Sequence, residues 1–472
     1  MYDLIVRELD VPPRVLRQLA ASRPERYPVL FDSAADGPSS RSSVLVAHPS
    51  GAIWLDPQGR LQSQGTVPRD VASGERGGFL AALERWLAGE PAAGAMPQGL
   101  PFTGGWAVFL GYELAAEIEP TLALPRASGV HAWQAFALRV PCALVHDKPS
   151  GKVMAIAETH AAQTLDAIES DAREAARDGI DFTALPAPPA VACITEEDPA
   201  AYLTRVRRGK EYIRAGDIYQ TNLSRAWRVE LRGAADVGRL YERLRGVNPA
   251  PFAALAQWRG GALLSSSPER LARVAGRRIE TRPIAGTRPR SRRPDEDARE
   301  TAALAAHPKE RAEHIMLVDL ERNDLGRICE PGTVRVEELM SIESYAHVHH
   351  IVSNVTGTLR PHATVIDVLR AVFPGGTITG CPKHRCMRII AELEGQGRGA
   401  YTGSLGLIGC DGSMDFNILI RTMTLAAGTL EFRAGAGIVA DSDPERELEE
   451  CRAKARGLLA VFGEAERTGA AA

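Results

Sequence analysis

Long apolar segments are missing from the 472-residue sequence. The longest stretch without a charged residue runs from Pro91 to Tyr112, and prolines, a glutamine and glycines interrupt it. A membrane-spanning helix needs about 20 predominantly apolar residues, so this stretch is not a candidate. The opening residues, MYDLIVRELD, already carry charges and contain no apolar core of a secretion signal. The sequence therefore predicts a cytoplasmic protein without a membrane-spanning segment.

Neither a large net charge nor a set of paired cysteines is present. Lysine and arginine number 56 against 59 acidic residues, which gives a net charge of −3. Proteins whose main task is to bind nucleic acid or an anionic membrane carry a basic excess, so both classes are excluded. The 7 cysteines are an odd, scattered set, which argues against a disulfide framework. With 44% hydrophobic and 24% charged residues, the composition is that of a globular protein.

Prolines and small residues divide the chain into two regions and a short tail. A proline-rich connector at 184–190 follows a predicted surface helix at 158–177. We therefore expect an N-terminal region over 1–190, a second region over 191–465 and a disordered tail over 466–472. Strand-like and helix-like segments follow one another without a regular βαβ alternation, which predicts an α+β fold.

After the connector, the sequence patterns typical of helices and strands are clearer. Asp198 and Pro199 are typical of an N-cap followed by proline in the first helical turn. Another helical stripe begins at Val365 and ends before the next proline. Two apolar runs, 403–408 and 417–423, predict a hairpin of buried strands.

Two segments place a pair of glutamates on one face of a predicted helix. Glu310 and Glu313 stand three residues apart, so their carboxylates point the same way. Glu447 and Glu450 repeat this spacing, and Lys454 follows one turn later. Two such helices facing one another would form an oxygen-only site suited to Mg²⁺. Taken alone, each segment is more simply interpreted as an exposed, salt-bridged helix.

Glycine-rich segments at 284–288, 374–380 and 434–438 lie near the ends of predicted strands. They lack the spacing of a P-loop or a dinucleotide-binding fingerprint. Small residues there allow backbone N–H groups to approach an anionic ligand, although each segment is also compatible with a tight turn.

Three clustered histidines, His347, His349 and His350, invite a metal-site interpretation. On a strand, the alternation of side chains separates His349 from its two neighbours, and no cysteine pair lies nearby. A single histidine facing a substrate is therefore the preferred interpretation.

The order of the motifs along the chain resembles the chorismate-utilising enzymes. The motifs are GDIYQTNLSR (216–225), SSPERL (266–271), RPIAGTRPR (282–290), ERAEHIMLVDLERNDLGR (310–327), VHHIVS (348–353), FPGGTITGCPKHRCMRII (373–390), NILIRTM (417–423), GAGIVADS (435–442) and E-x-x-E-x-x-x-K (447–454). More narrowly, they are similar to component I of anthranilate synthase and of aminodeoxychorismate synthase. The resemblance implies a large mixed α+β fold of layered antiparallel sheets flanked by helices.

This resemblance implies chorismate as the substrate and Mg²⁺ as the cofactor. Glu313 and Glu450 match the Mg²⁺ ligands, with Glu310 and Glu447 as a neighbouring second pair. The ion would bind the ring carboxylate and help to neutralise the departing C4 hydroxyl. Glu269 matches a general acid near that hydroxyl.

Further positions are implied to contact the substrate. His350 matches a histidine near the ring. Arg421 and Tyr401 match the groups that hold the enolpyruvyl carboxylate. The backbone at 435–437 matches the segment that holds the ring carboxylate. The positions that the resemblance implies to bind the substrate are Ala285, Gly286, Thr287, Thr377, Tyr401, Arg421, Gly435, Ala436 and Gly437, and Lys454 is implied to line the pocket as well.

Gln220 and Ala285 bear on the nucleophile and on the product. Family members that add water at C2 carry a lysine at the position of Gln220, so the glutamine implies ammonia as the nucleophile. Aminodeoxychorismate synthases carry a lysine at the position of Ala285, and that lysine adds to C2 before ammonia enters at C4. An alanine is no nucleophile, so taken alone it favours anthranilate synthase or a direct attack of ammonia.

Other segments favour the folate branch. The sequences FPGGTITGCPK (373–383) and YQTN (219–222) resemble aminodeoxychorismate synthases, and the tryptophan-feedback motif appears only as LFDS at 30–33. The preferred expectation is an aminodeoxychorismate synthase component I, a transferase that makes 4-amino-4-deoxychorismate for 4-aminobenzoate and folate. Anthranilate synthase component I, a lyase, is the alternative, and a non-catalytic chorismate-binding homologue is a remote one. With no glutaminase motif recognised, a separate glutamine amidotransferase subunit is expected to supply the ammonia.

Overall fold

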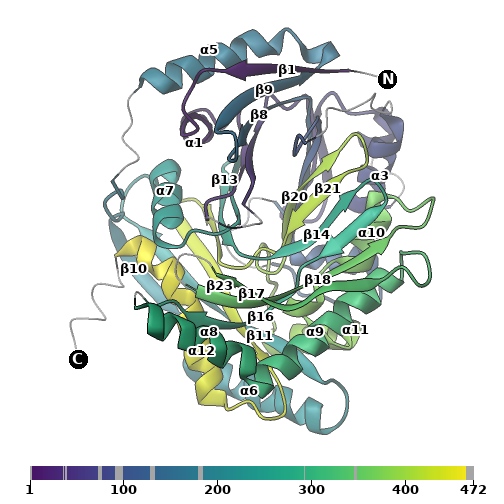
Figure 1. Cartoon of the computed structure of the whole chain (residues 1–472), viewed down its shortest axis with the longest axis vertical. Coiled ribbons are helices and arrows are strands. Elements are labelled where there is room, and N and C mark those ends of the chain that lie inside the picture. Colours follow the sequence, from purple (N-terminus) through teal and green to yellow (C-terminus); the bar gives the residue numbers. More distant parts are fainter. Residues whose placement is uncertain are drawn as a thin grey trace.

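Two large antiparallel β-sheets form the centre of the molecule (Figure 1). The computed structural model describes residues 3–35, 37, 40–72, 77–90, 99–127, 133–178, 184–291, 293–344 and 348–463. The predicted tail at 466–472 lies outside these residues.

The first sheet combines strands from both ends of the chain. Its strands in spatial order are β1 (Leu4–Leu9), β9 (Lys152–Glu158), β8 (Cys142–Asp147), β3 (Ser42–Ala47), β2 (Val29–Asp32), β12 (Phe252–Trp258), β13 (Gly261–Ser267), β22 (Thr422–Ala426), β23 (Thr429–Ile438), β11 (Gln220–Leu231) and β10 (Val191–Glu196), with β19 (Gly380–Cys381) also paired to β11. The two regions meet where β2 pairs with β12.

The second sheet is built in the same way. Its strands are β16 (Ile284–Pro289), β18 (Val348–Thr358), β15 (Arg278–Thr281), β14 (Arg270–Ala275), β21 (Met414–Asn417), β20 (Ser404–Gly409), β6 (Gly105–Leu110), β7 (Ala135–Val140), β4 (Gly51–Leu55) and β5 (Leu61–Gly65), with β17 (Arg335–Ser344) paired to β18. Here the two regions meet where β20 pairs with β6. Each sheet therefore contains strands from before and after the connector. A domain boundary near residue 190 stays a prediction.

Apolar side chains fill the space between the sheets and cover their outer faces. Val29 and Val44 of the first sheet share a buried cluster with Trp54 and Phe109 of the second. The helices are α1 (Val15–Ser22), α2 (Arg69–Ala72), α3 (Phe79–Gly89), α4 (Ala115–Ile118), α5 (Thr164–Arg177), α6 (Pro199–Arg214), α7 (Val237–Val247), α8 (Pro294–Ala306), α9 (Pro308–Gly326), α10 (Val365–Val372), α11 (Lys383–Glu394) and α12 (Pro444–Leu459). Within the described ranges, none of them is long and apolar enough to cross a bilayer.

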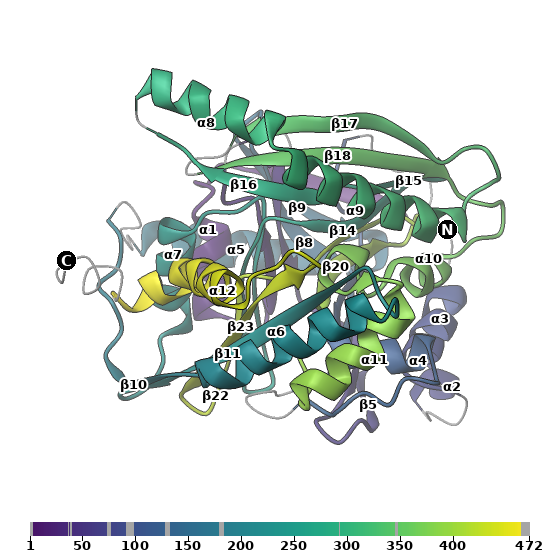
Figure 2. The same ribbon diagram turned by 90° about the horizontal axis from the view of Figure 1, so that it is seen from below.

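The helices form the two outer layers. Helices α1, α5, α6, α7 and α12 supply apolar side chains to the outer face of the first sheet, and α3, α9 and α10 supply them to the second. Figure 2 shows α12, α6 and α11 side by side along β23 and β11. Each sheet thus buries both of its faces, which confirms the predicted α+β fold of layered antiparallel sheets flanked by helices.

Side-chain caps mark the starts of two helices. Asp198 accepts a hydrogen bond from the N–H of Ala200 at 3.0 Å, and α6 begins at Pro199. Thr364 and Asp367 form a complete capping box at the start of α10. The cap at Asp198 was predicted from the sequence, whereas for α10 only the helical stripe from Val365 was predicted and the capping box was not.

The predicted hairpin of 403–408 with 417–423 is wrong. β20 pairs with β21 and β6 in the second sheet, and β21 already ends at Asn417. The chain then crosses to the first sheet, where β22 begins at Thr422 and pairs with β13. Arg421 lies at this crossing with a φ of 50°. The crossing residues 418–419 are as buried as strand residues, so their apolar pattern concealed the break.

A buried ion pair links the two sheets. Arg139 on β7 donates to both carboxylate oxygens of Glu158 at the end of β9, each at 2.7 Å. The two side chains are only 5% and 0% exposed. Removal of one partner would leave a buried charge without compensation.

We expect Arg139→Met to lower the free energy of unfolding by about 3–5 kcal/mol, because the Glu158 carboxylate loses its partner. Arg322→Met is the matched control, since Arg322 pairs with Asp319 at 2.7 Å while both side chains are more than half exposed. We expect the control to cost at most about 1 kcal/mol. Urea unfolding measures both values, and equal losses would contradict the structural role of the buried pair.

Candidate active site

The pairing of β11 with β23 brings Gln220 next to a glycine-rich segment. The register pairs Asn222 with Gly437 and Ser224 with Gly435. A Cβ atom at position 437 would lie 2.3 Å from Nε2 of Gln220, so the glycine leaves room for this side-chain amide beside the strand. Gln220 is 3% exposed, and its Oε1 has no hydrogen-bond partner within the described residues.

The acidic pair of α9 faces two of the glycine-rich segments. Nε2 of Gln220 donates to Oε1 of Glu313 at 3.4 Å, and a Cβ at position 437 would lie 3.6 Å from the same oxygen. One turn earlier, a Cβ at position 286 would lie 2.7 Å from Oε2 of Glu310. Gly286 has a φ of 66°, which also favours glycine. Both carboxylates therefore point toward a stretch of backbone that carries no side chain.

The acidic pair of α12 lies on a helix that packs against β23. Nζ of Lys454 pairs with Oε1 of Glu450 at 2.8 Å and donates to the carbonyl oxygen of Gly435 at 3.0 Å. Burial lowers the pKa of Lys454, but the charge of Glu450 outweighs this effect and the net shift is upward. The ammonium is therefore charged at neutral pH. Glu447, one turn before Glu450, is 6% exposed.

The carboxylates of α9 and α12 have the right donor chemistry for Mg²⁺. Hard oxygen ligands suit this ion, which takes one or two protein carboxylates and completes its shell with water and substrate oxygens. Among the described residues, however, no three His, Cys, Asp or Glu side chains form a preassembled metal cluster. Glu450 is engaged by Lys454, and Glu310 lies 3.7 Å from Arg288. The residues fit the ion by chemistry, and their role as ligands stays a prediction.

Glu269 is a buried carboxyl group between β13 and β14. Oγ1 of Thr377 donates to its Oε1 at 2.8 Å. Burial raises the pKa of Glu269 to about 7, although the hydrogen bond from Thr377 and the charges of Lys454 and Arg421 act in the opposite direction. A carboxyl group with this pKa is partly protonated at neutral pH and is able to donate a proton to a leaving group.

Arg421 lies near Glu269 and His350, since its charge acts on the pKa of both groups. Its guanidinium makes no hydrogen bond or ion pair with any described residue. Burial lowers the pKa of Arg421, and the charge of Glu269 opposes the shift. A half-buried guanidinium without a protein partner is suited to bind a carboxylate of a ligand.

Tyr401 approaches the glycine-rich segment of β23. Its hydroxyl donates to Oδ1 of Asn222 at 3.5 Å, and a Cβ at position 435 would lie 2.7 Å from that hydroxyl. Burial raises the pKa of Tyr401 to about 12, while the charges of Arg398 and Lys454 oppose the shift. The phenol is therefore neutral and able to form hydrogen bonds.

Strands β16 and β18 contribute Ala285, Gly286 and His350. The register pairs Thr287 with His350, although the side chain of Thr287 lies outside the described part of the structure. Burial and the charge of Arg421 lower the pKa of His350 to about 4, and a hydrogen bond with the backbone of Gly286 opposes the shift. The imidazole is therefore neutral. Ala285 is 7% exposed.

The histidine cluster separates as the strand alternation predicts. His349 forms hydrogen bonds with Oγ of Ser344 at 2.7 Å and with Asp297 at 2.9 Å, and thus belongs to a contact of its own. His350 instead lies near Arg421. His347 falls outside the described residues.

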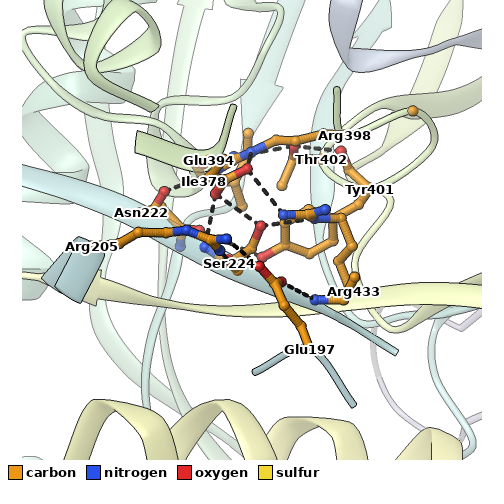
Figure 3. Close-up of polar contacts among 12 residues, drawn as sticks. Glu197, Arg205, Asn222, Ser224, Ile378, Glu394, Arg398, Tyr401, Thr402 and Arg433 are labelled. Carbon is orange, nitrogen blue, oxygen red and sulfur yellow. Dashed lines mark hydrogen bonds and ion pairs between the residues drawn. The ribbon is translucent and has the colours of Figure 1, made fainter. Parts of the chain in front are cut away.

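Three residues that the sequence did not single out lie around Tyr401 (Figure 3). Asn222 binds the hydroxyl of Tyr401, and Glu394 and Arg398 form a buried ion pair at 2.7 Å. The only available sequence signal was the spacing of Glu394 and Arg398, four residues apart in a segment rich in glycine.

We expect Glu269→Gln to be more stable than the wild type at pH 8, by about 3 kcal/mol, and the difference to shrink toward pH 5. The ordinary pKa of 4.5 in the unfolded chain rises to about 7 on folding. Between these values the unfolded chain releases the proton first, so the wild type loses stability as pH rises. The loss is complete above pH 7. Unfolding free energies at several pH values test this, and a difference independent of pH would contradict it.

Comparisons with known proteins agree with these motifs. A family model described as chorismate binding enzyme matches residues 34–460. An anthranilate synthase component I-like protein of Synechocystis sp. is 42% identical over 375 residues, which cover 78% of this chain and 74% of that protein. Anthranilate synthase component 1 1 of Haloarcula marismortui is 40% identical over 445 residues, which cover 88% of each chain. The crystal structure of anthranilate synthase component I from Streptococcus pneumoniae TIGR4 has a TM-score of 0.76 at 30% identity and covers 90% of this chain and 93% of that one. The chain belongs to the chorismate binding enzyme family.

Proposed function

We propose that this chain is component I of an anthranilate synthase, which converts chorismate and ammonia to anthranilate and pyruvate. The observation that carries the proposal is Ala285, a buried residue of β16 beside Gly286. An alanine is unable to form a covalent bond with C2, so ammonia must attack the ring directly. Relatives named anthranilate synthase component I, matched over most of the chain, support this function over the aminodeoxychorismate synthase preferred from the sequence.

In this proposal the substrate is held by its two carboxylates. Arg421, whose guanidinium has no partner among the described residues, binds the enolpyruvyl carboxylate together with Tyr401. The backbone of Gly435 and Gly437 binds the ring carboxylate, since the absence of side chains there leaves the strand accessible. Lys454 lies beside this segment through its hydrogen bond to Gly435.

The chemistry requires a proton donor at C4 and a nucleophile at C2. Glu269 in its protonated form gives its proton to the C4 hydroxyl, which leaves as water while ammonia attacks C2 and then loses a proton. Removal of the proton at C2, cleavage of the enolpyruvyl C3–O bond and protonation of the enolpyruvyl methylene carbon then release pyruvate and leave the aromatic ring of anthranilate. Oε1 of Gln220, buried and without a partner among the described residues, accepts a hydrogen bond from the ammonia. A bound Mg²⁺ would hold the ring carboxylate and neutralise part of its charge. His350 remains neutral beside the ring.

Ammonia is proposed to come from a separate glutamine amidotransferase subunit. The proposal rests on the family relationship and on the recognised motifs, which account for the carbon chemistry only. Free ammonium at alkaline pH would replace this partner in an assay of the isolated chain.

A second candidate is aminodeoxychorismate synthase component I. The segments 219–222 and 373–383, which resemble the folate branch, favour it. Both segments lie in the site, since Gln220 contacts Glu313 and Thr377 contacts Glu269. The two candidates share substrate, nucleophile and general acid, and they differ in the ring carbon that receives nitrogen.

A product assay separates the candidates. The purified chain is incubated with chorismate, Mg²⁺ and ammonium at alkaline pH, with and without an added aminodeoxychorismate lyase. We expect fluorescent anthranilate in both samples, because direct attack at C2 needs no second enzyme. Formation of 4-aminobenzoate only with the lyase would establish the second candidate instead. Binding of chorismate without any product would identify a non-catalytic homologue.

The proposed metal ligands are tested by Glu313→Gln and Glu450→Gln. We expect each variant to lose at least about a hundredfold of Mg²⁺-dependent turnover and the rise in Tm that Mg²⁺ causes, because an amide is a weaker ligand. Glu449→Gln is the matched control on α12, since Glu449 is 64% exposed and pairs with Arg452. Wild-type turnover in both test variants would refute the metal assignment.

A further inference from the structure

Glu394 is a carboxylate buried behind the proposed site. It ends α11, and its side chain is 0% exposed. Arg398 donates through Nη2 to Oε1 at 2.7 Å and through Nε to Oε2 at 3.0 Å, and Ser224 donates its N–H and hydroxyl at 2.8 and 2.9 Å. Burial raises the pKa of Glu394, but the charges of Arg398 and Arg433 outweigh burial and hold it at about 2. The group is therefore an ion with a complete set of donors.

The guanidinium of Arg398 reaches three other segments (Figure 3). Nη2 donates to the carbonyl oxygen of Asn222 at 2.7 Å, and Nη1 donates to that of Ile378 at 3.3 Å and to Oγ1 of Thr402 at 3.4 Å. The guanidinium also lies over the ring of Tyr401, 5.5 Å from its centroid. One planar group thus contacts β11, the turn at 376–378 and the loop at 401–402.

Each of these contacts lies next to a group of the proposed site. Asn222 holds the hydroxyl of Tyr401, and it follows Gln220 by two residues on β11. Ile378 directly follows Thr377, which donates to Glu269. The site groups therefore come from three segments whose relative positions depend on the same guanidinium.

The N-terminal region holds the same loop from outside. The carboxylate of Glu113 accepts hydrogen bonds from the N–H groups of Arg398 and Gly399, the latter at 3.1 Å. The N–H of Tyr112 donates to the carbonyl oxygen of Gly399 at 2.8 Å, and the ring of Tyr112 lies against the guanidinium of Arg398. Backbone and side chain of Arg398 are thus both fixed.

We propose that Arg398 and Glu394 form a positioning pair for Tyr401 in the carboxylate site that Tyr401 forms with Arg421. The inference rests on the proposed function, because it assumes that an enolpyruvyl carboxylate binds there. Arg398 itself is 1% exposed and does not contact the substrate. The pair acts through geometry, since a guanidinium fork has fixed donor directions that the single ammonium of lysine does not reproduce.

A second buried ion pair provides a matched control. Arg139 and Glu158 are 5% and 0% exposed and share two hydrogen bonds of 2.7 Å, as closely engaged as Arg398 and Glu394. Arg139 also contacts Glu90, the carbonyl oxygen of Gly105 and the ring of Trp106, and none of these residues contributes to the proposed site. Loss of this pair affects the fold without moving Tyr401.

The test compares Arg398→Lys with Arg139→Lys. We expect both variants to lose Tm to a similar extent without ligand. Only Arg398→Lys is expected to bind chorismate about tenfold to a hundredfold more weakly, with a matching rise in KM, since misplacement by about 1 Å costs about this much. Binding is measured by calorimetry and by the rise in Tm with chorismate, and KM and kcat by the ammonium-dependent assay.

Two results would overturn the proposal. One is wild-type chorismate affinity in a destabilised Arg398→Lys, and the other is an equal loss of affinity in Arg139→Lys. If Arg398→Lys does not fold, Ser224→Ala replaces it, because this variant removes one donor to Glu394 and leaves the ion pair in place. We expect Ser224→Ala to raise KM for chorismate by a few fold without loss of kcat. An unchanged KM would contradict the inference. Failure of the proposed function would appear differently, as a wild type without product, while the affinity comparison still tests the positioning pair.

Discussion

The close pairing of β11 with β23 is the constraint on which the proposed site depends. A Cβ at position 435 would lie 2.7 Å from the carbonyl oxygen of Leu223 and from the hydroxyl of Tyr401, and a Cβ at position 437 would lie 2.3 Å from Nε2 of Gln220, so the two glycines leave room for these groups beside the strand. This pairing places Gln220 at one end of the pair and the hydroxyl of Tyr401 beside it. Helices α9 and α12 then bring their acidic pairs toward the same strand: Glu313 lies 3.4 Å from Gln220, and Lys454, the partner of Glu450, donates to the carbonyl oxygen of Gly435.

Burial gives the titratable groups of this site different charges. It raises the pKa of Glu269 to about 7 and lowers that of His350 to about 4, so the acid is able to hold a proton while the imidazole does not. The shifts go in opposite directions because burial disfavours whichever form is charged. Glu394 shows the contrasting case, in which two arginines and a serine outweigh burial and keep a carboxylate ionised. A proton donor and a fixed anion therefore lie within the same core.

Local patterns made part of this arrangement predictable from the sequence. The cap of α6, the apolar stripe of α10 and the spacing of Glu310 and Glu313 concern neighbouring residues, and the resemblance to chorismate-utilising enzymes added the layered antiparallel sheets. The crossing at Arg421 was missed because buried residues between two sheets carry the same apolar pattern as a strand. The contacts of Arg398 were missed because they join segments far apart in the chain. The preferred product was chosen from segments that resemble the folate branch, whereas Ala285 and the named relatives favour anthranilate.

A crystal structure of the chain with chorismate and Mg²⁺, in the absence of ammonia, tests the site most directly. The account predicts the enolpyruvyl carboxylate within hydrogen-bond distance of Arg421 and Tyr401, and the ring carboxylate at the backbone of 435–437. The C4 hydroxyl is then expected beside Glu269. Chorismate bound elsewhere, or bound with C4 turned away from Glu269, would contradict the account.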